Sequence, residues 1–391
     1  MRGDTPQPRE QYEAAARHAL QEDGMGDPRL EKLAKILVHY SLKIRPRDLF
    51  RIAGPSLAMP LLRALYDEAL TVGAYPYVRI SGEGLEELYY RKASDDQLRF
   101  VSELDRQEVE RMDATISILG KWNTREFTGI PPKRLAMRRE TTTELQRRFL
   151  ERAARGELRW CGTQYPTHAE AQDAEMSLAE YEDFVFDAGM LHEADPVAAW
   201  QRVGAEQDRI VQVLSRAKQL VYKGPDVDLQ VSVAGRTWIS AAGHENFPDG
   251  EVFTGPVEDS TNGRVRFSFP AIFAGREVDG IELTFERGKV VAAHASKGAD
   301  FLEAMLDTDT GARYLGELAF GLNYNIQRFT RNILFDEKIG GTMHMALGIG
   351  YPETGSKNTS GLHWDMICDL RTDSEVKADG TVIYRNGHFV I

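Results

Sequence analysis

Residues 360–370, SGLHWDMICDL, alternate polar and apolar side chains around an imidazole and two carboxylates. His363, Asp365 and Asp369 share one parity. The other parity is apolar, with Trp364, Met366, Cys368 and Leu370. Successive side chains of a β-strand point to opposite faces, so the pattern predicts a strand with one apolar and one polar face. Two interpretations follow: a half-buried strand with a solvated face, or a strand on which His363 and Asp365 are neighbouring metal ligands.

A second histidine lies in GGTMHMALGIGYPETG, where His344 is flanked by two methionines. In a strand, His344 would share its face with Thr342 and Ala346, and these small neighbours leave room for a group to approach the imidazole. The alternative is a core histidine whose hydrogen bonds are satisfied by the protein.

Two glutamates have unusual settings. Glu317 interrupts the apolar run ARYLGELAFGL, and a buried carboxylate is costly unless it is paired or binds a metal. The alternative is a solvent-facing turn of an amphipathic helix, although Gly316 and Gly321 weaken a helix there. Glu251 follows the Pro-Asp-Gly turn of NFPDGEVFTGP, where an exposed turn acid is the alternative.

These candidates make a set of three carboxylates and two imidazoles: Glu251, Glu317, His344, His363 and Asp365. Such a set suits two adjacent divalent cations with a bridging carboxylate and a bridging water. It contains no cysteine, which argues against a structural thiolate zinc site. The spacing matches no compact motif, so the residues alone indicate only a dinuclear hydrolase, which includes a two-metal phosphoesterase, and a non-catalytic metal- or peptide-binding protein remains an alternative.

The first half of the chain predicts an α/β domain. Asp27 and Pro28 are the N-cap and first residue of a helix. Strand patterns at 48–54, 75–80, 114–120 and 158–164 then alternate with helix patterns, including one helix over 97–112, and this order is typical of a mainly parallel sheet. The first strand-to-helix turn, IAGPSLAMP, lacks a glycine-rich phosphate loop.

The second half predicts an α+β domain rich in antiparallel strands, and this domain carries the candidate metal site. Asn262-Gly263 and Asn386-Gly387 are hairpin-turn signals. Two helix patterns interrupt the strands, around 300–306 and 312–322. We place the boundary near Asp195-Pro196, which divides the chain into an N-terminal extension (1–26), an α/β domain (27–195) and a catalytic metal-binding domain (196–391).

Composition narrows the function classes. A net charge of −12 over 391 residues argues against a nucleic-acid binder. We find no apolar run long enough to cross a membrane, and the first residues lack the apolar core of a secretory signal. The two cysteines, Cys161 and Cys368, fit a reducing cytoplasm.

Three long stretches resemble the thermophilic-type metallo-aminopeptidase family. They are PDGEVFTGPVEDSTNG, YLGELAFGLNYNIQRFTRNILFDEKIGGTMHMALGIGYPETG and NTSGLHWDMICDL. The likeness extends into the first half, through DPRLEKLAKILVHYSLKI and GTQYPTHAEAQDAEMSLAEYEDFVFDA, and covers nearly everything after Met25. Long collinear similarity of this kind is more specific than a single short motif.

The resemblance implies a homodimeric two-metal exopeptidase that acts on peptides with a free N-terminus. Zinc, cobalt or manganese would be held by the five candidate ligands, and the family's tyrosine near the metals corresponds to Tyr351. We expect Tyr351 to donate a hydrogen bond to the tetrahedral oxyanion. The proton of the attacking water would be carried by Glu317, if its metal contact is loose, or by Glu337. We expect the neighbouring Lys338 to be a surface cation.

Overall fold

The computed structural model describes residues 27–273 and 275–391, so the expected N-terminal extension lies outside the described residues. Helix α2 (Pro28–Lys35) begins where the sequence predicts, because Asp27 accepts a hydrogen bond from the backbone N–H of Arg29 at 2.9 Å. The helix continues into a π-helical segment, η1 (Ile36–Ser41).

The first half contains a five-stranded sheet in which every strand pair is parallel, which confirms the predicted α/β class. Its order is β2 (Tyr75–Ser81), β1 (Leu49–Pro55), β3 (Ala114–Leu119), β4 (Arg159–Gln164) and β8 (Asn246–Phe247). The connecting helices are η2 (Ser56–Ala58), α3 (Met59–Val72), α4 (Leu85–Lys92), α5 (Asp95–Leu98), α6 (Glu103–Arg111), α7 (Pro132–Ala154), α8 (His168–Asp173) and α9 (Leu178–Ala188).

The single helix predicted over 97–112 is wrong, because the chain forms α5 and α6 with a break between them. Ser102 caps the second helix by accepting a hydrogen bond from the N–H of Leu104 at 3.1 Å. A serine side chain competes with the helix ladder in this way and favours a new start over an uninterrupted helix.

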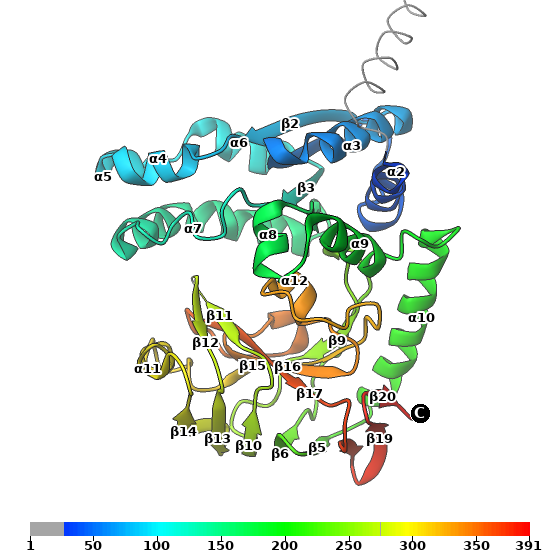
Figure 1. Cartoon of the computed structure of the whole chain (residues 1–391), viewed down its shortest axis with the longest axis vertical. Coiled ribbons are helices and arrows are strands. Elements are labelled where there is room, and N and C mark those ends of the chain that lie inside the picture. The colour runs from blue at the N-terminus through cyan, green and yellow to red at the C-terminus, as the bar shows by residue number, and fades with distance from the viewer. Residues whose placement is uncertain (1–26, 274) are drawn as a thin grey trace, which may run out of the picture.

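After α10 (Pro196–Leu214), the chain forms antiparallel sheets, as predicted. The larger sheet has the order β14 (Lys289–His294), β13 (Glu282–Glu286), β10 (Asn262–Arg266), β6 (Val227–Ser232), β5 (Gln219–Lys223), β18 (Glu375–Ala378), β19 (Thr381–Arg385) and β20 (His388–Phe389). A hairpin, β11 (Ala271–Phe273) and β12 (Arg276–Val278), and helix α11 (Ala299–Leu306) lie beside it (Figure 1).

The smaller antiparallel sheet positions the candidate site. Its order is β17 (His363–Asp369), β16 (Thr342–Gly348), β15 (Leu315–Gly321), β9 (Glu251–Thr254) and β7 (Ile239–Ala241). The short helices α12 (Ile333–Asp336) and η3 (Pro352–Thr354) lie in the connections between its strands.

One of the two hairpin signals is confirmed. Asn386 and Gly387 have φ values of +46° and +85° and join β19 to β20 as a two-residue turn. The signal at Asn262-Gly263 is wrong, because both residues lie inside β10. Gly263 is needed there for close packing, since a Cβ on it would lie 2.1 Å from the carbonyl oxygen of Asp228.

The helix predicted around 312–322 is also wrong, because this segment contains strand β15, whose seven residues are all buried. A strand covered on both faces loses the period-2 alternation and resembles a buried helix in sequence. The glycines indicate the strand, since a Cβ on Gly316 would lie 2.2 Å from the carbonyl oxygen of Ile349 and one on Gly321 would lie 2.3 Å from that of Ile339.

Two main hydrophobic cores lie in the described ranges, one around each half of the chain. The core of the parallel sheet also takes in residues from beyond the expected boundary, including Phe247, Leu334 and Phe335. In Figure 1, α12 accordingly lies between α8 and α9 on one side and β15 and β16 on the other. A domain division at 195/196 therefore stays a prediction.

Within residues 27–273 and 275–391, no helix is both long and apolar enough to span a membrane.

Candidate metal centre

The five residues predicted to bind metal lie on four adjacent strands, β9, β15, β16 and β17. Ala346 of β16 pairs with Glu317 on one side and with Asp365 on the other. Paired residues of neighbouring strands point to the same face of the sheet, so the small methyl group of Ala346 leaves a space between the two carboxylates.

The opposite face of β17 packs into the core. Trp364 is 2% exposed, and its ring lies 5.6 Å from that of Phe273 and 5.9 Å from that of Phe301. Met366 and Cys368 are buried in the same cluster. The predicted separation of an apolar and a polar face along this strand is therefore confirmed.

Glu317 lies between the two histidines. Its Oε1 is 3.4 Å from Nε2 of His344, and its Oε2 is 3.7 Å from Nε2 of His363. Each histidine also has a carboxylate of its own: His344 Nε2 lies 3.2 Å from Glu251 Oε2, and His363 Nε2 lies 3.4 Å from Asp365 Oδ2. The five residues thus form two groups of three that share Glu317, and in each group the three ligand atoms lie within 4.8 Å of one another.

Glu337 reaches the same space from a different element, since it follows α12 directly. One ligand atom each from Glu337, His344 and Asp365 also lie within 4.8 Å of one another. Glu337 is therefore a sixth potential ligand, and its side chain is 16% exposed.

Sequence reasoning did not identify Lys338 as a buried cation of the site. Lys338 was expected on the surface but is fully buried, so that prediction is wrong. Its ammonium group pairs with Glu337 and lies 3.6 Å from Glu251 and 3.9 Å from Asp249, which is also buried. No local pattern in the sequence indicates this burial, because two of the carboxylate partners of Lys338, Asp249 and Glu251, lie far away along the chain. Asp249 looked like an ordinary turn residue.

Burial and mutual repulsion shift the pKa values of this cluster. Burial raises the pKa of Glu337 to about 8 and that of Asp249 to about 7, with repulsion from Glu251 adding to both shifts. Burial alone would lower the pKa of His363, but its ion pairs with Asp365 and Glu317 raise it to about 10. In the absence of metal cations, some of these side chains, such as Glu337 and His363, are therefore protonated at neutral pH.

The residues fit a divalent cation. Glu251 Oε2 and His344 Nδ1 are buried and make no hydrogen bond of good geometry within the described part of the chain, although Nε2 of His344 lies 3.2 Å from that oxygen. A buried carboxylate oxygen without a well-placed donor is costly unless a cation binds it. The cluster offers oxygen and nitrogen atoms and no thiolate, as zinc, cobalt and manganese sites in hydrolases do.

Tyr351 lies at the open side of the cluster and is 47% exposed. Its ring is 5.7 Å from that of His363 and 5.5 Å from that of Phe253. Partial burial and the neighbouring carboxylates Glu317 and Asp365 raise the pKa of the phenol, so it remains a hydrogen-bond donor at neutral pH.

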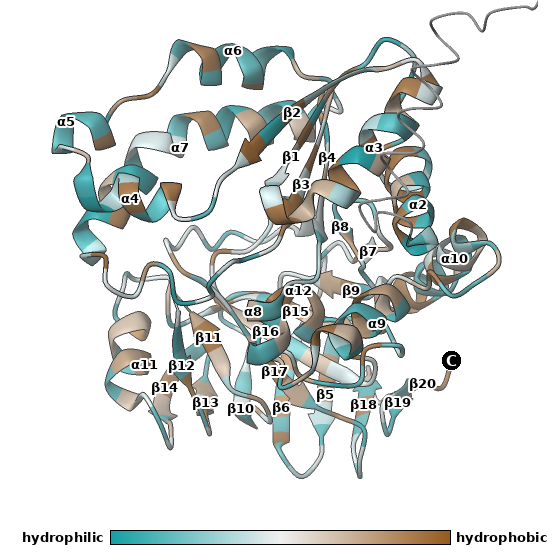
Figure 2. Ribbon diagram, turned by 45° about the horizontal axis from the view of Figure 1, so that its top comes forward, coloured by the Kyte–Doolittle hydropathy of each residue, from teal (hydrophilic) through white to brown (hydrophobic). Residues whose placement is uncertain are grey.

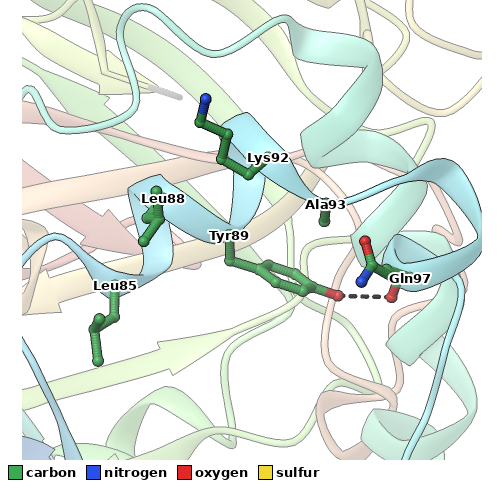
Figure 3. Close-up of a pocket in the computed structure, with 6 residues that line it drawn as sticks. All are labelled: Leu85, Leu88, Tyr89, Lys92, Ala93 and Gln97. Atoms are coloured by element: carbon green, nitrogen blue, oxygen red, sulfur yellow. Dashed lines mark hydrogen bonds between the residues drawn. The ribbon is translucent and has the colours of Figure 1, made fainter.

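A hollow elsewhere on the surface is not a second candidate. It has a volume of about 320 Å³ and is formed by helix α4 and the residues that follow it (Figure 3). Its lining contains no carboxylate and no imidazole: Leu85, Leu88, Tyr89, Lys92, Ala93 and Gln97.

A buried set of carboxylates and imidazoles on an antiparallel sheet, attached to a parallel α/β part, suits a metal-dependent enzyme. The chain belongs to the thermophilic metalloprotease (M29) family, whose model matches residues 26–389. Both this metalloprotease family and the names of its relatives confirm the enzyme class predicted from the sequence, a metallo-aminopeptidase.

Curated relatives match over most of their length. Aminopeptidase 2 of Geobacillus stearothermophilus is 29% identical, over 92% of this chain and 97% of that protein. Aminopeptidase T of Thermus thermophilus is 28% identical, over 85% of this chain and 87% of that protein.

Solved structures agree with the fold. Wild-type AmpT from Thermus thermophilus superposes with a TM-score of 0.83 at 26% identity, covering 93% of this chain and 99% of that one. A 2,5-dihydroxypyridine dioxygenase from Pseudomonas putida, with a TM-score of 0.57 at 14% identity over 92% and 96% of the two chains, shares the fold alone.

Proposed function

We propose that this metallo-aminopeptidase holds two divalent cations per chain and hydrolyses the first peptide bond of peptides with a free N-terminus. Zinc, cobalt or manganese would be held by the five ligands Glu251, Glu317, His344, His363 and Asp365. The observation that carries the proposal is the position of Glu317, whose two oxygens face two separate histidine–carboxylate pairs. A carboxylate placed in this way suits a bridge between two cations.

The charge of the cluster supports the same number of cations. Five carboxylates and one ammonium group gather here: Asp249, Glu251, Glu317, Glu337, Asp365 and Lys338. With every carboxylate ionised and both imidazoles neutral, four negative charges remain, which equals the charge of two divalent cations. A single divalent cation would leave a buried excess charge, which is unfavourable in a low-dielectric site.

Bound divalent cations lower the pKa of water and polarise a carbonyl group. Within this chemistry we assign the proton transfer to Glu337, because both oxygens of Glu317 face histidine–carboxylate pairs. Glu337 takes a proton from the attacking water and delivers it to the leaving amine. Tyr351 donates a hydrogen bond from its phenolic hydroxyl to the developing oxyanion. A free α-amine would be recognised by one of the cations or by a neighbouring carboxylate, which favours free N-termini.

Removal and readdition of metal test this function. We expect extended chelation to abolish hydrolysis of an aminoacyl anilide, and activity to return in proportion to added metal up to two equivalents per chain. An N-acetylated anilide should remain uncut, and a phosphate monoester serves as the control for a two-metal phosphoesterase. Full activity in metal-free protein would overturn the proposal, and a plateau at one equivalent would overturn the two-metal site.

We further propose a cytoplasmic homodimer. Both cysteines, Cys161 and Cys368, are buried and free, which fits a reducing compartment.

Strand β2 is an edge of the parallel sheet, and its Val78 and Ile80 are 42% and 46% exposed; Figure 2 shows the apolar end of this strand. Exposed apolar residues on an edge strand favour pairing with another chain. Sedimentation at micromolar concentration should give twice the chain mass. The Ile80→Lys variant should give a measured mass closer to that of a single chain.

A further inference from the structure

The segment that carries Glu337 is tied to the parallel sheet by a side-chain hydrogen bond. Helix α12, a single turn, is capped by Asn332, whose Oδ1 accepts from the N–H of Leu334 at 3.2 Å. The other end of the same amide donates from Nδ2 to Oε1 of Gln164 at 3.0 Å. One side chain therefore both starts the helix and joins it to strand β4, which ends at Gln164.

The orientation of the Gln164 amide is fixed by its surroundings. The side chain is 1% exposed, and its Nε2 donates to Oε2 of Glu170 at 2.6 Å and to the carbonyl oxygen of Tyr165 at 2.9 Å. A flipped amide would turn its oxygen towards two acceptors and its NH₂ towards the NH₂ of Asn332. The amide oxygen of Gln164 consequently points at Asn332.

Side-chain packing also holds α12 against the N-terminal half of the chain. The ring of Phe335 lies 5.1 Å from that of Phe184 and 6.5 Å from that of Tyr181, both on α9. Asp336 accepts from the N–H and the hydroxyl of Thr330 at 2.7 and 2.8 Å. Figure 1 shows α12 between α9 and the metal-centre strands. Glu337, the next residue, is thus positioned both by ring contacts with α9 of the N-terminal half and by hydrogen bonds within its own segment.

We propose that Gln164 is a positioning residue for the metal centre, acting through Asn332 and α12 on the carboxylate of Glu337. Gln164 lies in the parallel sheet and touches neither a candidate ligand nor Tyr351, so nothing in its local surroundings marks it as functional. The proposal rests on the proposed role of Glu337. It implies that the α/β half contributes to catalysis by positioning this carboxylate.

Two variants test the link. Gln164→Met removes the amide and keeps an unbranched chain of similar size, whereas Asn332→Ser retains a helix-capping hydroxyl and is too short to reach Gln164. The measurements are kcat/KM and the affinity of the metal-free protein for Co²⁺ in competition with a chelator. We expect each variant to lose about 10-fold in both, because Glu337 is also a sixth potential ligand of the cluster, and the double variant to lose no more than either.

The same substitutions in a Glu337→Gln background separate positioning from general stability. We expect Gln164→Met to have no further effect there, since the carboxylate that it positions is gone. Gln207→Met, on α10, is the control, because Gln207 is also 1% exposed and its amide oxygen also takes part in a hydrogen bond, which it accepts from the hydroxyl of Ser240. This control should lower the melting temperature and leave Co²⁺ affinity unchanged.

The outcomes are distinct. Equal losses from Gln164→Met in both backgrounds, or no loss in the wild-type background, overturn the positioning role while leaving the proposed function intact. No effect of Glu337→Gln alone overturns the role proposed for Glu337 and the positioning proposal with it. If Gln164→Met fails to fold, as circular dichroism would show, Asn332→Ser decides alone.

Discussion

The ammonium group of Lys338 lies 3.6 Å from Oε1 of Glu251, and the two side chains are 0% and 8% exposed. A buried lysine in this position is the counter-charge of the candidate site in the absence of metal. Removing one partner of a buried ion pair leaves an uncompensated charge and typically costs about 3–5 kcal/mol.

Lys338→Met should therefore destabilise the metal-free protein by about 3–5 kcal/mol. The variant site is more negative, so we expect added Zn²⁺ or Co²⁺ to raise its melting temperature more than that of the wild type. Thermal unfolding with and without chelator measures both effects. Lys357→Met, at an exposed position, is the control and should stay within about 0.5 kcal/mol. A Lys338→Met protein with wild-type stability in chelator would contradict this counter-charge role.

The two faces of β17 should respond differently to truncation. His363→Ala and Asp365→Ala each remove a proposed ligand, so metal content and activity should fall. Trp364→Ala should mainly lose stability, by about 3–5 kcal/mol, because it leaves a cavity beside Phe273 and Phe301. Metal analysis and urea unfolding on all three variants decide the matter, and metal retention with full turnover in His363→Ala would refute its assignment.

Tyr351→Phe tests the oxyanion donor. A donor that acts mainly in the transition state lowers kcat more than it raises KM, and removal of one such donor typically costs about 100- to 1,000-fold. The ring contacts with His363 and Phe253 are preserved by phenylalanine, so the fold and both metals should remain. A near-normal kcat with two metals bound would assign Tyr351 to shaping the turn instead.

The pH dependence of stability should differ between the metal-free and metal-bound protein. The pKa of His363 is raised to about 10 and that of Glu337 to about 8, so between pH 6.5 and 8 the folded state binds more protons than the unfolded chain. Stability of the metal-free protein should consequently fall as pH rises through this window. Cations bind the deprotonated ligands, so the metal-induced rise in melting temperature should grow over the same window.

Melting curves at pH 6.5, 7.2 and 8 with chelator or saturating Zn²⁺ provide the comparison. His39→Gln is a suitable control, since His39 lies on η1 and pairs with Glu68 away from the cluster. A metal-induced shift that is constant across these pH values would contradict the proton–metal competition.

Local patterns in the sequence were sufficient for much of this architecture. The Asp27-Pro28 start and the Asn386-Gly387 turn each depend on a few neighbouring residues, and both form as predicted. Alternation likewise predicted β17, because one of its faces is buried and the other carries the polar side chains. The collinear family likeness then supplied the choice of a peptidase, which the set of candidate ligands alone left open.

Errors occurred where tertiary packing decides the structure. Strand β15 is covered on both faces and carries no alternation, so Glu317 seemed to belong to a helix. Lys338 seemed to be a surface cation, because the carboxylates that accommodate it come from distant parts of the chain and no local pattern records them. Gln164 gave no functional signal for the same reason, since its partner Asn332 lies 168 residues away.

Pairing of β9, β15, β16 and β17 in one register has a consequence for evolution. Neighbouring residues of a strand face opposite sides, so a one-residue insertion ahead of His344 within β16 would present a methionine to the site and send the imidazole into the core. Insertions in connecting loops that carry no site residue leave the strand pairing intact. Length differences among members of this family should therefore collect in loops away from Glu337, Lys338 and Tyr351, and the spacing between residues within each ligand-bearing strand should be invariant.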